Sequence, residues 1–431
     1  MIYNLPVETS GRPADWVVKP LADIAKVVGG GTPDTGNPEY WNPPEIPWVT
    51  PTDITKCSGP VLEKTERGIS QAGLRDSSAT PLPVGATLLT SRATIGECRL
   101  AGVPVATNQG FASLVPRDPN DSHFLFYLAQ SVKPVFVRLA AGTTFAEVSR
   151  REIRRVNVCV PTEPGERAEI GPLLETSDRA LAAAEAKLAA ARQLKTALMQ
   201  QLFTRGIPGR HSCFEQTKIG EIPTGWKIKR VSDVVSGNIY NGLSPQSRPD
   251  PPGVPILNVS CISSGRCNPR NVTYVDLLDK PHEDLIAHAG DFYVLRGNGN
   301  REYIATGGLL TEEPPPNCVF SDLLIKIPFD PDKTVRGFMP LLWQSHEFLR
   351  RLQSKAVSGS GLWKIGLREI RRHDFAEPPR EEQEEIVNAL RAAGEYLSTC
   401  EAELHALGRL KQSLLQNLLT GRVRVRVESG Q

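Results

Sequence analysis

Two stretches of the chain repeat apolar side chains at alternating intervals of four and three residues. The first runs from Ile170 to Leu202 and the second from Ile386 to Leu418. A mean spacing of about 3.5 residues is typical of a coiled-coil seam, so each stretch predicts one long helix that packs against the other. Two independent surface helices are the alternative, which the matched seams disfavour. We expect one set of leucines to lie in the helix seam or to contact partner subunits. These leucines are Leu174, Leu181, Leu188, Leu198, Leu390, Leu397, Leu404 and Leu414.

The two helices belong to a larger internal repeat. The residues REIRR occur at 151–155 and again at 368–372, which is 217 positions later. At nearly the same offset, LKTALMQQLFT at 194–204 matches LKQSLLQNLLT at 410–420. Self-similarity at a fixed distance indicates a duplicated structural unit. We therefore predict an internal pseudo-two-fold repeat.

Between the matching parts, the segments around 40–140 and 235–355 barely align. We call the matching parts the repeated frame. The segments that the frame encloses differ between the two halves. The first helix leads from one globular domain to the other, and the second helix leaves the second domain, so domains at opposite ends require antiparallel helices. The predicted regions are a first domain at 1–163, a helix at 164–205, a second domain at 206–378, and a helix with a tail at 379–431.

Each globular region predicts a mixed α/β fold. Short strand-like runs alternate with loops rich in glycine, proline and asparagine. Examples of these runs are ATLLTS at 86–91, DFYVLR at 291–296 and DLLIKIPF at 322–329.

Composition narrows the class of protein. A chain of 431 residues is too long for one ordinary core, which agrees with two domains. No apolar run approaches the roughly 18–20 residues of a membrane span, and no export signal is visible, so we expect a cytoplasmic protein. The eight cysteines form no C-x-x-C pair, which favours reduced thiols over a metal site.

No catalytic signature is complete. The stretch GGGTPDTG at 29–36 lacks the Lys-Ser/Thr of a phosphate-binding loop, which indicates an ordinary loop. The stretch NPPE at 42–45 resembles the Asn-Pro-Pro-aromatic motif of amino-methyltransferases, but Glu45 stands where the aromatic residue would stack on the target base. The seven histidines have no metal or triad spacing. We therefore predict a chain that is not an enzyme and binds no cofactor or metal itself.

The repeated motifs resemble the specificity subunit of type I restriction-modification systems. The resemblance covers nearly the whole chain and is most specific in the second half. The motifs that carry it are GATLLTSRATIG at 85–96, NQGF at 108–111, LREIRRHDFAEPPREEQEEI at 367–386 and LKQSLLQNLLTGRVRV at 410–425. One departure is Arg167, which stands where the second copy has the expected Gln383.

This resemblance implies a division of labour. Each globular domain would be a target-recognition domain that reads one half of a split, asymmetric double-stranded DNA site. The two helices would set the spacer between the halves and dock two modification (methyltransferase) subunits. Those subunits would hold S-adenosylmethionine and methylate adenine, and a restriction subunit would translocate and cut the DNA.

Net charge gives little support to DNA binding, because it is only +2, so any basic face must be local. Arg pairs with guanine and Asn or Gln with adenine in the major groove, which directs attention to such side chains in loops. For each one, the other interpretation is a solvated loop residue or an internal turn bond. The candidates are Arg92, Thr94, Asn108 and Gln109 in the first domain, and Asn241, Arg296, Asn298, Asn300, Arg301 and Lys364 in the second.

Two other function classes remain open at this point. A stand-alone DNA methyltransferase or nuclease would need the catalytic motifs that the sequence lacks. A coiled-coil scaffold without a role in DNA binding would leave two divergent domains unexplained.

Overall fold

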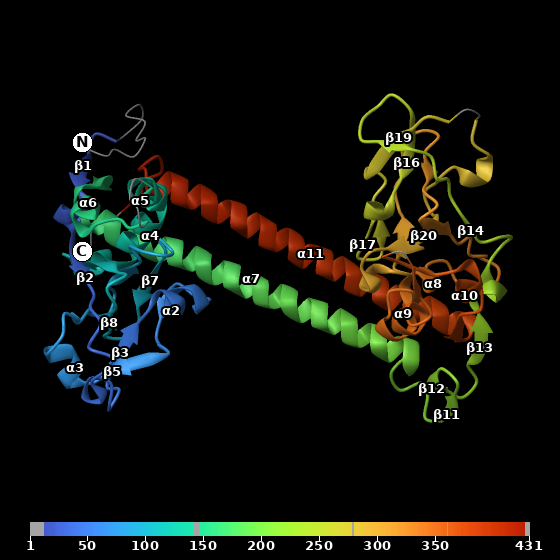
Figure 1. Cartoon of the computed structure of the whole chain (residues 1–431), viewed down its shortest axis with the longest axis horizontal. Helices are drawn as coiled ribbons and strands as arrows, with labels where there is room; N and C mark the ends of the chain where they lie inside the picture. Colours follow the sequence, from blue (N-terminus) through green and yellow to red (C-terminus); the bar gives the residue numbers. More distant parts are fainter. Residues whose placement is uncertain (1–12, 142–145, 278–279, 360, 427–431) are drawn as a thin grey trace. The chain divides into compact units, whose positions relative to one another are not determined.

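The computed structural model describes residues 13–141, 146–277, 280–359 and 361–426 (Figure 1). The chain divides into two compact units. Unit 1 combines residues 1–186 with 402–431, and unit 2 is the continuous segment 187–401. Each unit therefore holds one globular domain together with part of each long helix.

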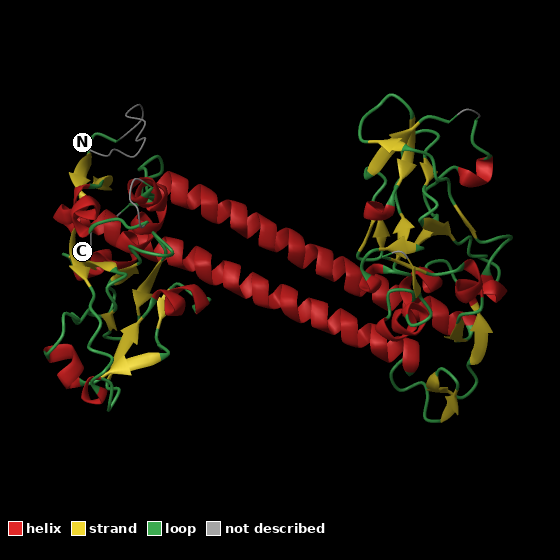
Figure 2. Cartoon of the chain, viewed as in Figure 1, coloured by secondary structure: helices red, strands yellow, loops and turns green. Residues whose placement is uncertain are grey.

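Unit 1 has the mixed α/β character that the sequence predicts (Figure 2). One sheet runs in the order β2-β9-β6-β7-β4, a second in the order β5-β3-β8, and β1 pairs with β10. The strands are β1 (Trp16–Pro20), β2 (Ala25–Gly29), β3 (Ile46–Val49), β4 (Val61–Leu62), β5 (Arg67–Ile69), β6 (Thr87–Leu89), β7 (Cys98–Ala101), β8 (Ala106–Thr107), β9 (Ala112–Pro116) and β10 (Asn157–Pro161). The helices are α1 (Leu21–Ile24), α2 (Pro51–Lys56), α3 (Gln71–Arg75), α4 (Ser122–Ser131), α5 (Lys133–Ala140), α6 (Arg150–Arg155) and the first part of α7 (Pro164–Thr204).

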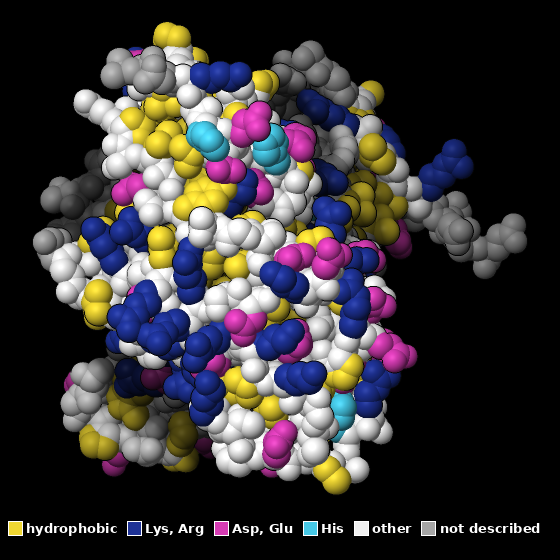
Figure 3. Space-filling view, turned by 90° about the vertical axis from the view of Figure 1, so that its right-hand side faces the viewer, with side chains coloured by type: hydrophobic (Ala, Val, Ile, Leu, Met, Phe, Trp, Pro, Cys, Tyr) yellow, Lys and Arg dark blue, Asp and Glu magenta, His cyan; other side chains and the backbone are white. Residues whose placement is uncertain are grey.

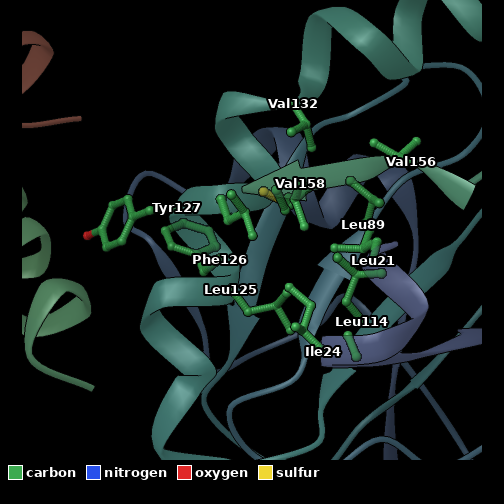
Figure 4. Close-up of a cluster of buried hydrophobic side chains, with 14 of the residues drawn as sticks. Leu21, Ile24, Leu89, Leu114, Leu125, Phe126, Tyr127, Val132, Val156 and Val158 are labelled. Atoms are coloured by element: carbon green, nitrogen blue, oxygen red, sulfur yellow. The ribbon is translucent and has the colours of Figure 1, made fainter. Parts of the chain in front are cut away.

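The core of unit 1 joins elements from distant parts of the sequence. Figure 4 shows side chains from α1, β6, β9, α4 and β10 gathered around one another. Leu174 of α7 and Leu418 of α11 (Arg380–Leu418) belong to the same cluster of buried residues. The last helix of the chain thus completes the core of the first domain.

Unit 2 is also mixed α/β. Its sheets run in the orders β14-β24-β20-β22-β18-β17, β15-β19-β16-β23 and β21-β26-β25, and two further pairs are β11-β12 and β13-β27. The strands are β11 (Phe214–Thr217), β12 (Gly220–Pro223), β13 (Lys227–Arg230), β14 (Tyr240–Asn241), β15 (Ser247–Arg248), β16 (Val254–Leu257), β17 (Ile262–Ser263), β18 (Arg266–Cys267), β19 (Val272–Val275), β20 (Phe292–Leu295), β21 (Gly297–Asn298), β22 (Gly307–Leu310), β23 (Val319–Phe320), β24 (Leu324–Lys326), β25 (Val357–Gly359), β26 (Leu362–Lys364) and β27 (Asp374–Glu377). Beside the long helices, its α-helices are α8 (Phe338–Leu342), α9 (His346–Gln353) and α10 (Leu367–Arg371).

The internal repeat is confirmed in the backbone that enters and leaves each domain. Strand β1 pairs antiparallel with β10 in unit 1, and β13 pairs in the same way with β27 in unit 2. Just beyond these pairs, the N–H of Leu21 donates to the carbonyl of Val156 at 2.8 Å, and the N–H of Val231 donates to that of His373 at 3.0 Å. Val156 and His373 are 217 positions apart, so they occupy one position of the repeated frame.

The long helices run antiparallel within each unit, as predicted. In unit 1, Asp178 of α7 pairs with Lys411 of α11, whereas Glu166, at the start of α7, binds Arg424 beyond the end of α11. Going forward along α7 therefore means going backward along α11. The ion pairs of unit 2 follow the same reversed order.

Burial varies among the predicted seam leucines. Leu174, Leu188 and Leu390 are buried. By contrast, Leu194, between two seam positions, is 60% exposed, so position on the helix rather than residue type decides burial. The remaining seam leucines, Leu181, Leu198, Leu397, Leu404 and Leu414, are half-buried.

A buried glutamate anchors the first turn of each long helix. Glu166 of α7 and Glu382 of α11 are 216 positions apart, and each is 1% exposed. Arg424 donates to both carboxylate oxygens of Glu166 at 2.7 Å. Glu382 accepts from the indole N–H of Trp226 at 3.0 Å and the backbone N–H of Ile207 at 3.1 Å.

A second pair of frame positions explains the departure at Arg167. Gln383 donates to the carbonyl of Pro378 at 3.0 Å, and Arg167 donates to the equivalent carbonyl of Pro161 at 3.1 Å. The guanidinium also donates to Asp121 at 2.9 Å, where Gln383 instead accepts from backbone and hydroxyl groups. Burial raises the pKa of Asp121 despite its arginine partner. The arginine and the aspartate are therefore a matched replacement for one glutamine.

Within the described ranges, no helix is long and apolar enough to cross a membrane.

Candidate nucleic-acid interface

The candidate residues of the first domain come together on two neighbouring loops. Arg92 follows β6, and Gln109 precedes β9. The N–H of Ser91 donates to the carbonyl of Gly110 at 2.8 Å, which ties the two loops to each other. The Arg92 side chain is 48% exposed and pairs with Glu147 at 2.9 Å. Arg92 is thus presented at the surface and oriented by a carboxylate.

Thr94 does not share this exposure. Its hydroxyl oxygen is buried and has no hydrogen-bond partner among the described residues. Its carbonyl accepts a hydrogen bond of 2.5 Å from the hydroxyl of Thr90, which closes the turn after β6. The structure therefore places the Thr94 hydroxyl inside the turn, and the Thr94 carbonyl helps to close the loop that carries Arg92.

The glycine-rich stretch at 29–36 packs directly on the second of these loops. The N–H of Gly31 donates to the carbonyl of Thr107 at 2.8 Å, and the hydroxyl of Thr32 donates to Gln109. A Cβ atom on Gly30 would lie 2.1 Å from the carbonyl oxygen of Asn108, so only glycine allows this approach. The loop that lacks a phosphate-binding signature therefore belongs to the candidate interface, a role that sequence reasoning missed.

The candidates of the second domain gather around the sheet β21-β26-β25. Within it, Asn298 pairs with Trp363 and Gly297 pairs with Lys364. The guanidinium of Arg301 lies 4.9 Å from the ring centre of Trp363, which is a cation–π contact. The backbone of Arg296 joins the sheet by accepting from the N–H of Ile365 at 2.9 Å.

Asn241 lies on β14 and is linked to this group through the backbone. Arg296 donates to the carbonyl of Asp322 at 3.4 Å, and the N–H of Asp322 donates to the carbonyl of Leu243 at 2.7 Å. Asn241 is two residues before Leu243, so all six candidates of the second domain lie on one connected set of loops and strands.

Several candidate asparagines use their side-chain oxygen within their own turn. The oxygen of Asn108 accepts from Gly110 N–H at 2.9 Å, that of Asn298 accepts from Asn300 N–H at 2.9 Å, and that of Asn300 accepts from Glu302 N–H at 3.0 Å. The amide NH₂ group remains available as a donor. Paired reading of adenine needs both the oxygen and the nitrogen, so in these residues the oxygen would have to serve the turn and the base at the same time.

The two interfaces differ in charge at one equivalent position. Glu147 and Lys364 are 217 positions apart. Glu147 pairs with the loop that follows β6, and Lys364 pairs with the segment that follows β20. In unit 1 the acidic residue neutralises Arg92. In unit 2 the position is an exposed lysine. The same frame thus carries a neutral pair in one domain and a cation in the other.

The arginine-rich REIRR helices, α6 and α10, have packing roles at several positions. Ile153 and Ile370 are fully buried, and Arg154 and Arg371 donate to backbone carbonyls of their own domains at 3.3 and 3.4 Å.

Figure 3 shows Lys and Arg side chains gathered on the left part of the face of unit 2 that lies to the right in Figure 1. Unit 2 therefore carries a local group of cationic side chains on this face.

In the part of the chain that the structure describes, no group of three or more His, Cys, Asp and Glu side chains could hold a metal ion. The cysteines are free thiols. Burial raises the pKa of Cys98 and of Cys318 to about 12, which keeps these thiols protonated and unreactive.

Comparison with known proteins identifies relatives of this chain. A family model described as the type I restriction modification DNA specificity domain matches residues 13–191. The MjaIX specificity subunit of Methanocaldococcus jannaschii is 30% identical over 264 residues, which are 59% of this chain and 60% of the relative. The putative MjaX specificity subunit of the same organism is 23% identical over 432 residues, or 96% of this chain and 95% of the relative.

Solved structures share the fold. The HsdS subunit from Thermoanaerobacter tengcongensis has a TM-score of 0.50 at 16% identity and covers 96% of this chain and 98% of its own. The S subunit from M. genitalium has a TM-score of 0.55 at 13% identity, with coverage of 95% and 97%. The chain is thus similar in sequence to type I restriction enzyme specificity subunits and shares the fold of solved S subunits.

Proposed function

We propose that this chain is the DNA-reading subunit of a type I restriction-modification complex, in which each globular domain reads one half of a split, asymmetric site. The observation that carries the proposal is a repeated frame around two dissimilar surfaces. Equivalent positions of the frame make equivalent backbone contacts in both units. The candidate interfaces differ in residues and in charge, as at Glu147 and Lys364. Such a chain can offer the same docking sites to identical partners while reading two different half-sites.

Catalysis is assigned to partner subunits. Two modification subunits would hold S-adenosylmethionine and methylate adenine, and a restriction subunit would cut the DNA. In this chain the methyltransferase-like stretch at 42–45 has a structural role, because the carboxylate of Glu45 accepts a hydrogen bond of 3.1 Å from the N–H of Gln71. Since the substrate would be chromosomal DNA, we also propose a cytoplasmic location.

The seam leucines would support assembly indirectly. Leu174 and Leu390 are at most 1% exposed and belong to the cores of unit 1 and unit 2. Such side chains cannot reach another protein. We therefore assign the docking of modification subunits to the outer faces of α7 and α11, which the seam holds in place.

Exchanging one domain tests the two-reader proposal. Residues 40–140 are replaced by the same region of a homologue with a different site, and the chain is expressed with its modification subunit. Genome-wide mapping of methylated adenines should then show one half-site changed and the other retained. A change in both halves, or methyl transfer by the rigorously purified single chain, would contradict the proposal.

Lengthening the helices tests their role as a spacer. One heptad added to each helix, near residues 186 and 401, preserves the seam because the seam repeats every seven residues. The unread spacer should change while both half-sites stay the same. An insertion at 206–209 is a poorer test, because Ile207 is bonded to Glu382 in the core of unit 2.

A further inference from the structure

The long helices carry a lysine at equivalent places, and the surroundings of the two lysines differ. Lys195 of α7 and Lys411 of α11 are 216 positions apart. In unit 1, Lys411 pairs with Asp178, and these side chains are 24% and 13% exposed. The other oxygen of Asp178 accepts a hydrogen bond of 2.7 Å from the hydroxyl of Tyr127 in α4. Lys411 is therefore neutralised inside its own unit.

Lys195 in unit 2 lacks this neutralisation. The residue equivalent to Asp178 is Gly394, again 216 positions later, so the aspartate that pairs with Lys411 has no equivalent here. Among the described residues, Lys195 has no hydrogen-bond or ion-pair partner. Gly394 and Lys195 line one cavity of about 440 Å³. Pro340 and Leu341 of α8 line this cavity, together with Gln344.

A difference in residue size accounts for the cavity. In unit 1, α4 packs closely on α7 at Gly171, where a Cβ atom would lie 2.6 Å from the Cβ of His123. The equivalent residue of α11, 216 positions later, is Val387, which lines the cavity in unit 2. A valine side chain at this place prevents the backbone approach that glycine allows. Space closed by packing in unit 1 is therefore open in unit 2.

The cavity continues on the other side of Lys195. A second cavity of about 690 Å³ shares Lys195, Ser264, Gly265 and Gln344 with the first. Together they form a groove with Lys195 at its middle. Its accessible apolar lining includes Ile262, Leu349 and Leu397 in one cavity and Leu309 and Leu341 in the other. Its charged lining includes Arg192, Arg266, Arg391, Glu302 and Glu395.

We propose that this groove binds an acidic segment of a partner polypeptide, one carboxylate of which pairs with Lys195 as Asp178 pairs with Lys411. A half-buried cation without a partner favours an incoming anion. The apolar walls on both sides of the lysine suit the flanking side chains of a polypeptide, whereas a free phosphate would use only the cation.

Two opposite substitutions test the site. Lys195→Gln removes the cation. Gly394→Asp supplies the missing internal carboxylate and copies unit 1, and a Cβ at this position meets no atom within 4 Å. Both variants should therefore bind the partner's carboxylate more weakly. The first has no cation, and in the second the cation is already paired. Arg409→Gln, at an exposed position of α11 in unit 1, removes the same charge elsewhere and serves as the control.

The probe is a fluorescent oligo-glutamate peptide, whose binding to the full chain is followed by anisotropy at low salt. The wild type and Arg409→Gln should bind it, and both groove variants should bind at least about tenfold more weakly, since losing one charge-assisted pair costs this much or more. Equal binding by all four chains would overturn the proposal. Displacement of the peptide from the wild type by inorganic phosphate or by duplex DNA would also overturn it, because the site would then accept anions in general.

The inference rests on the proposed function in one respect, because the modification subunit is the partner expected in the complex. Co-purification therefore gives a second readout, in which Lys195→Gln and Gly394→Asp should retain less modification subunit than the wild type. A wild-type chain that neither binds this subunit nor directs methylation would contradict the proposed function. A wild-type chain that assembles normally, with both groove variants assembling equally well, would contradict only the inference.

Discussion

Glu166 and Glu382 occupy the same position in two copies of one frame, yet different groups satisfy them. Glu166 faces the guanidinium of Arg424, which also binds Asp15 at 2.8 Å. Glu382 accepts from an indole, from the backbone and from the imidazole of His211 at 2.8 Å. The comparison teaches that a buried carboxylate at this position needs hydrogen-bond donors. The donors themselves can differ between the two copies.

The same lesson holds at two other positions. Arg167 with Asp121 replaces Gln383, and Val156 replaces His373, without a change in the backbone contacts around them. Divergence inside the duplicated frame therefore proceeds by replacing whole sets of partners. Removing a single member of a set should cost more than exchanging the complete set.

The largest expected effect is at the arginine of unit 1. Arg424→Ala leaves the carboxylate of Glu166, which is 1% exposed, without its cation. The free energy of unfolding of unit 1 should fall by about 3 kcal/mol, because the carboxylate that stays behind is buried even though Arg424 is 39% exposed. Hydrogen exchange resolved by segment separates unit 1 from unit 2. Arg426→Ala, at an exposed position nearby, is the control, and an equal loss in that variant would refute the assignment.

Exchanging Arg167 should have the next largest effect. Arg167→Gln alone leaves the buried Asp121 without its cation and should cost roughly 2–3 kcal/mol. In unit 2 the hydroxyl of Thr334 donates to Gln383 at 3.2 Å. The double variant Arg167→Gln/Asp121→Thr introduces this pair of residue types and should recover at least half of that loss. Chemical denaturation of the two single variants and the double variant measures the coupling. Simple additivity would show that the two residues are not a set.

A pH dependence should distinguish His373 from Val156. Burial lowers the pKa of His373 to about 3, and the ring is held neutral between the carbonyl of Phe348 and the ammonium of Lys355. Below its ordinary pKa of 6.5 the unfolded chain binds a proton that the folded chain does not. Stability is therefore complete above pH 6.5 and falls as the pH drops toward 3.

At pH 5 the expected loss is about 2 kcal/mol. His373→Val, which copies unit 1, should remove this part of the acid sensitivity. Urea denaturation of both chains at pH 7 and pH 5 tests it, and identical losses in the two chains would rule out His373 as the cause.

The smallest effect is expected at His211. After His211→Ala, Glu382 still accepts from Trp226 and Ile207, so one hydrogen bond of about 1 kcal/mol is lost. The same hydrogen-exchange experiment on unit 2 measures it. A loss as large as that of Arg424→Ala would mean that His211 is the main partner of Glu382. The two glutamates would then each depend on a single side chain, and the contrast between the units would disappear.

The parts of the fold that depend on regular spacing were predictable from the sequence. A 3.5-residue period reveals the seam whatever the tertiary context, and Leu174 and Leu390 are buried as it indicates. The strands β6, β20 and β24 lie inside the predicted runs for the same reason. The constant offset of the repeat also identifies equivalent positions in the two halves from the residues alone.

The candidate site was less predictable, because its geometry depends on contacts between distant segments. Glu147 meets Arg92 across 55 positions of sequence, and no local pattern announces that pairing. Gly30 belongs to the interface only because its missing side chain lets two loops touch. The turn bonds of Asn298 and Asn300 are local, but the sequence alone does not distinguish them from outward-facing amides.

The discontinuity of unit 1 has a consequence for the order in which a ribosome can complete the two halves. Unit 2 is one continuous segment, whereas unit 1 needs Leu418, Leu419 and Arg424 to close the core around Trp16. At typical rates of about 5–20 residues per second, the first domain waits on the order of ten seconds or more for those residues. The half that is synthesised first is therefore finished last, and its unfilled core is exposed to chaperones and proteases throughout that interval.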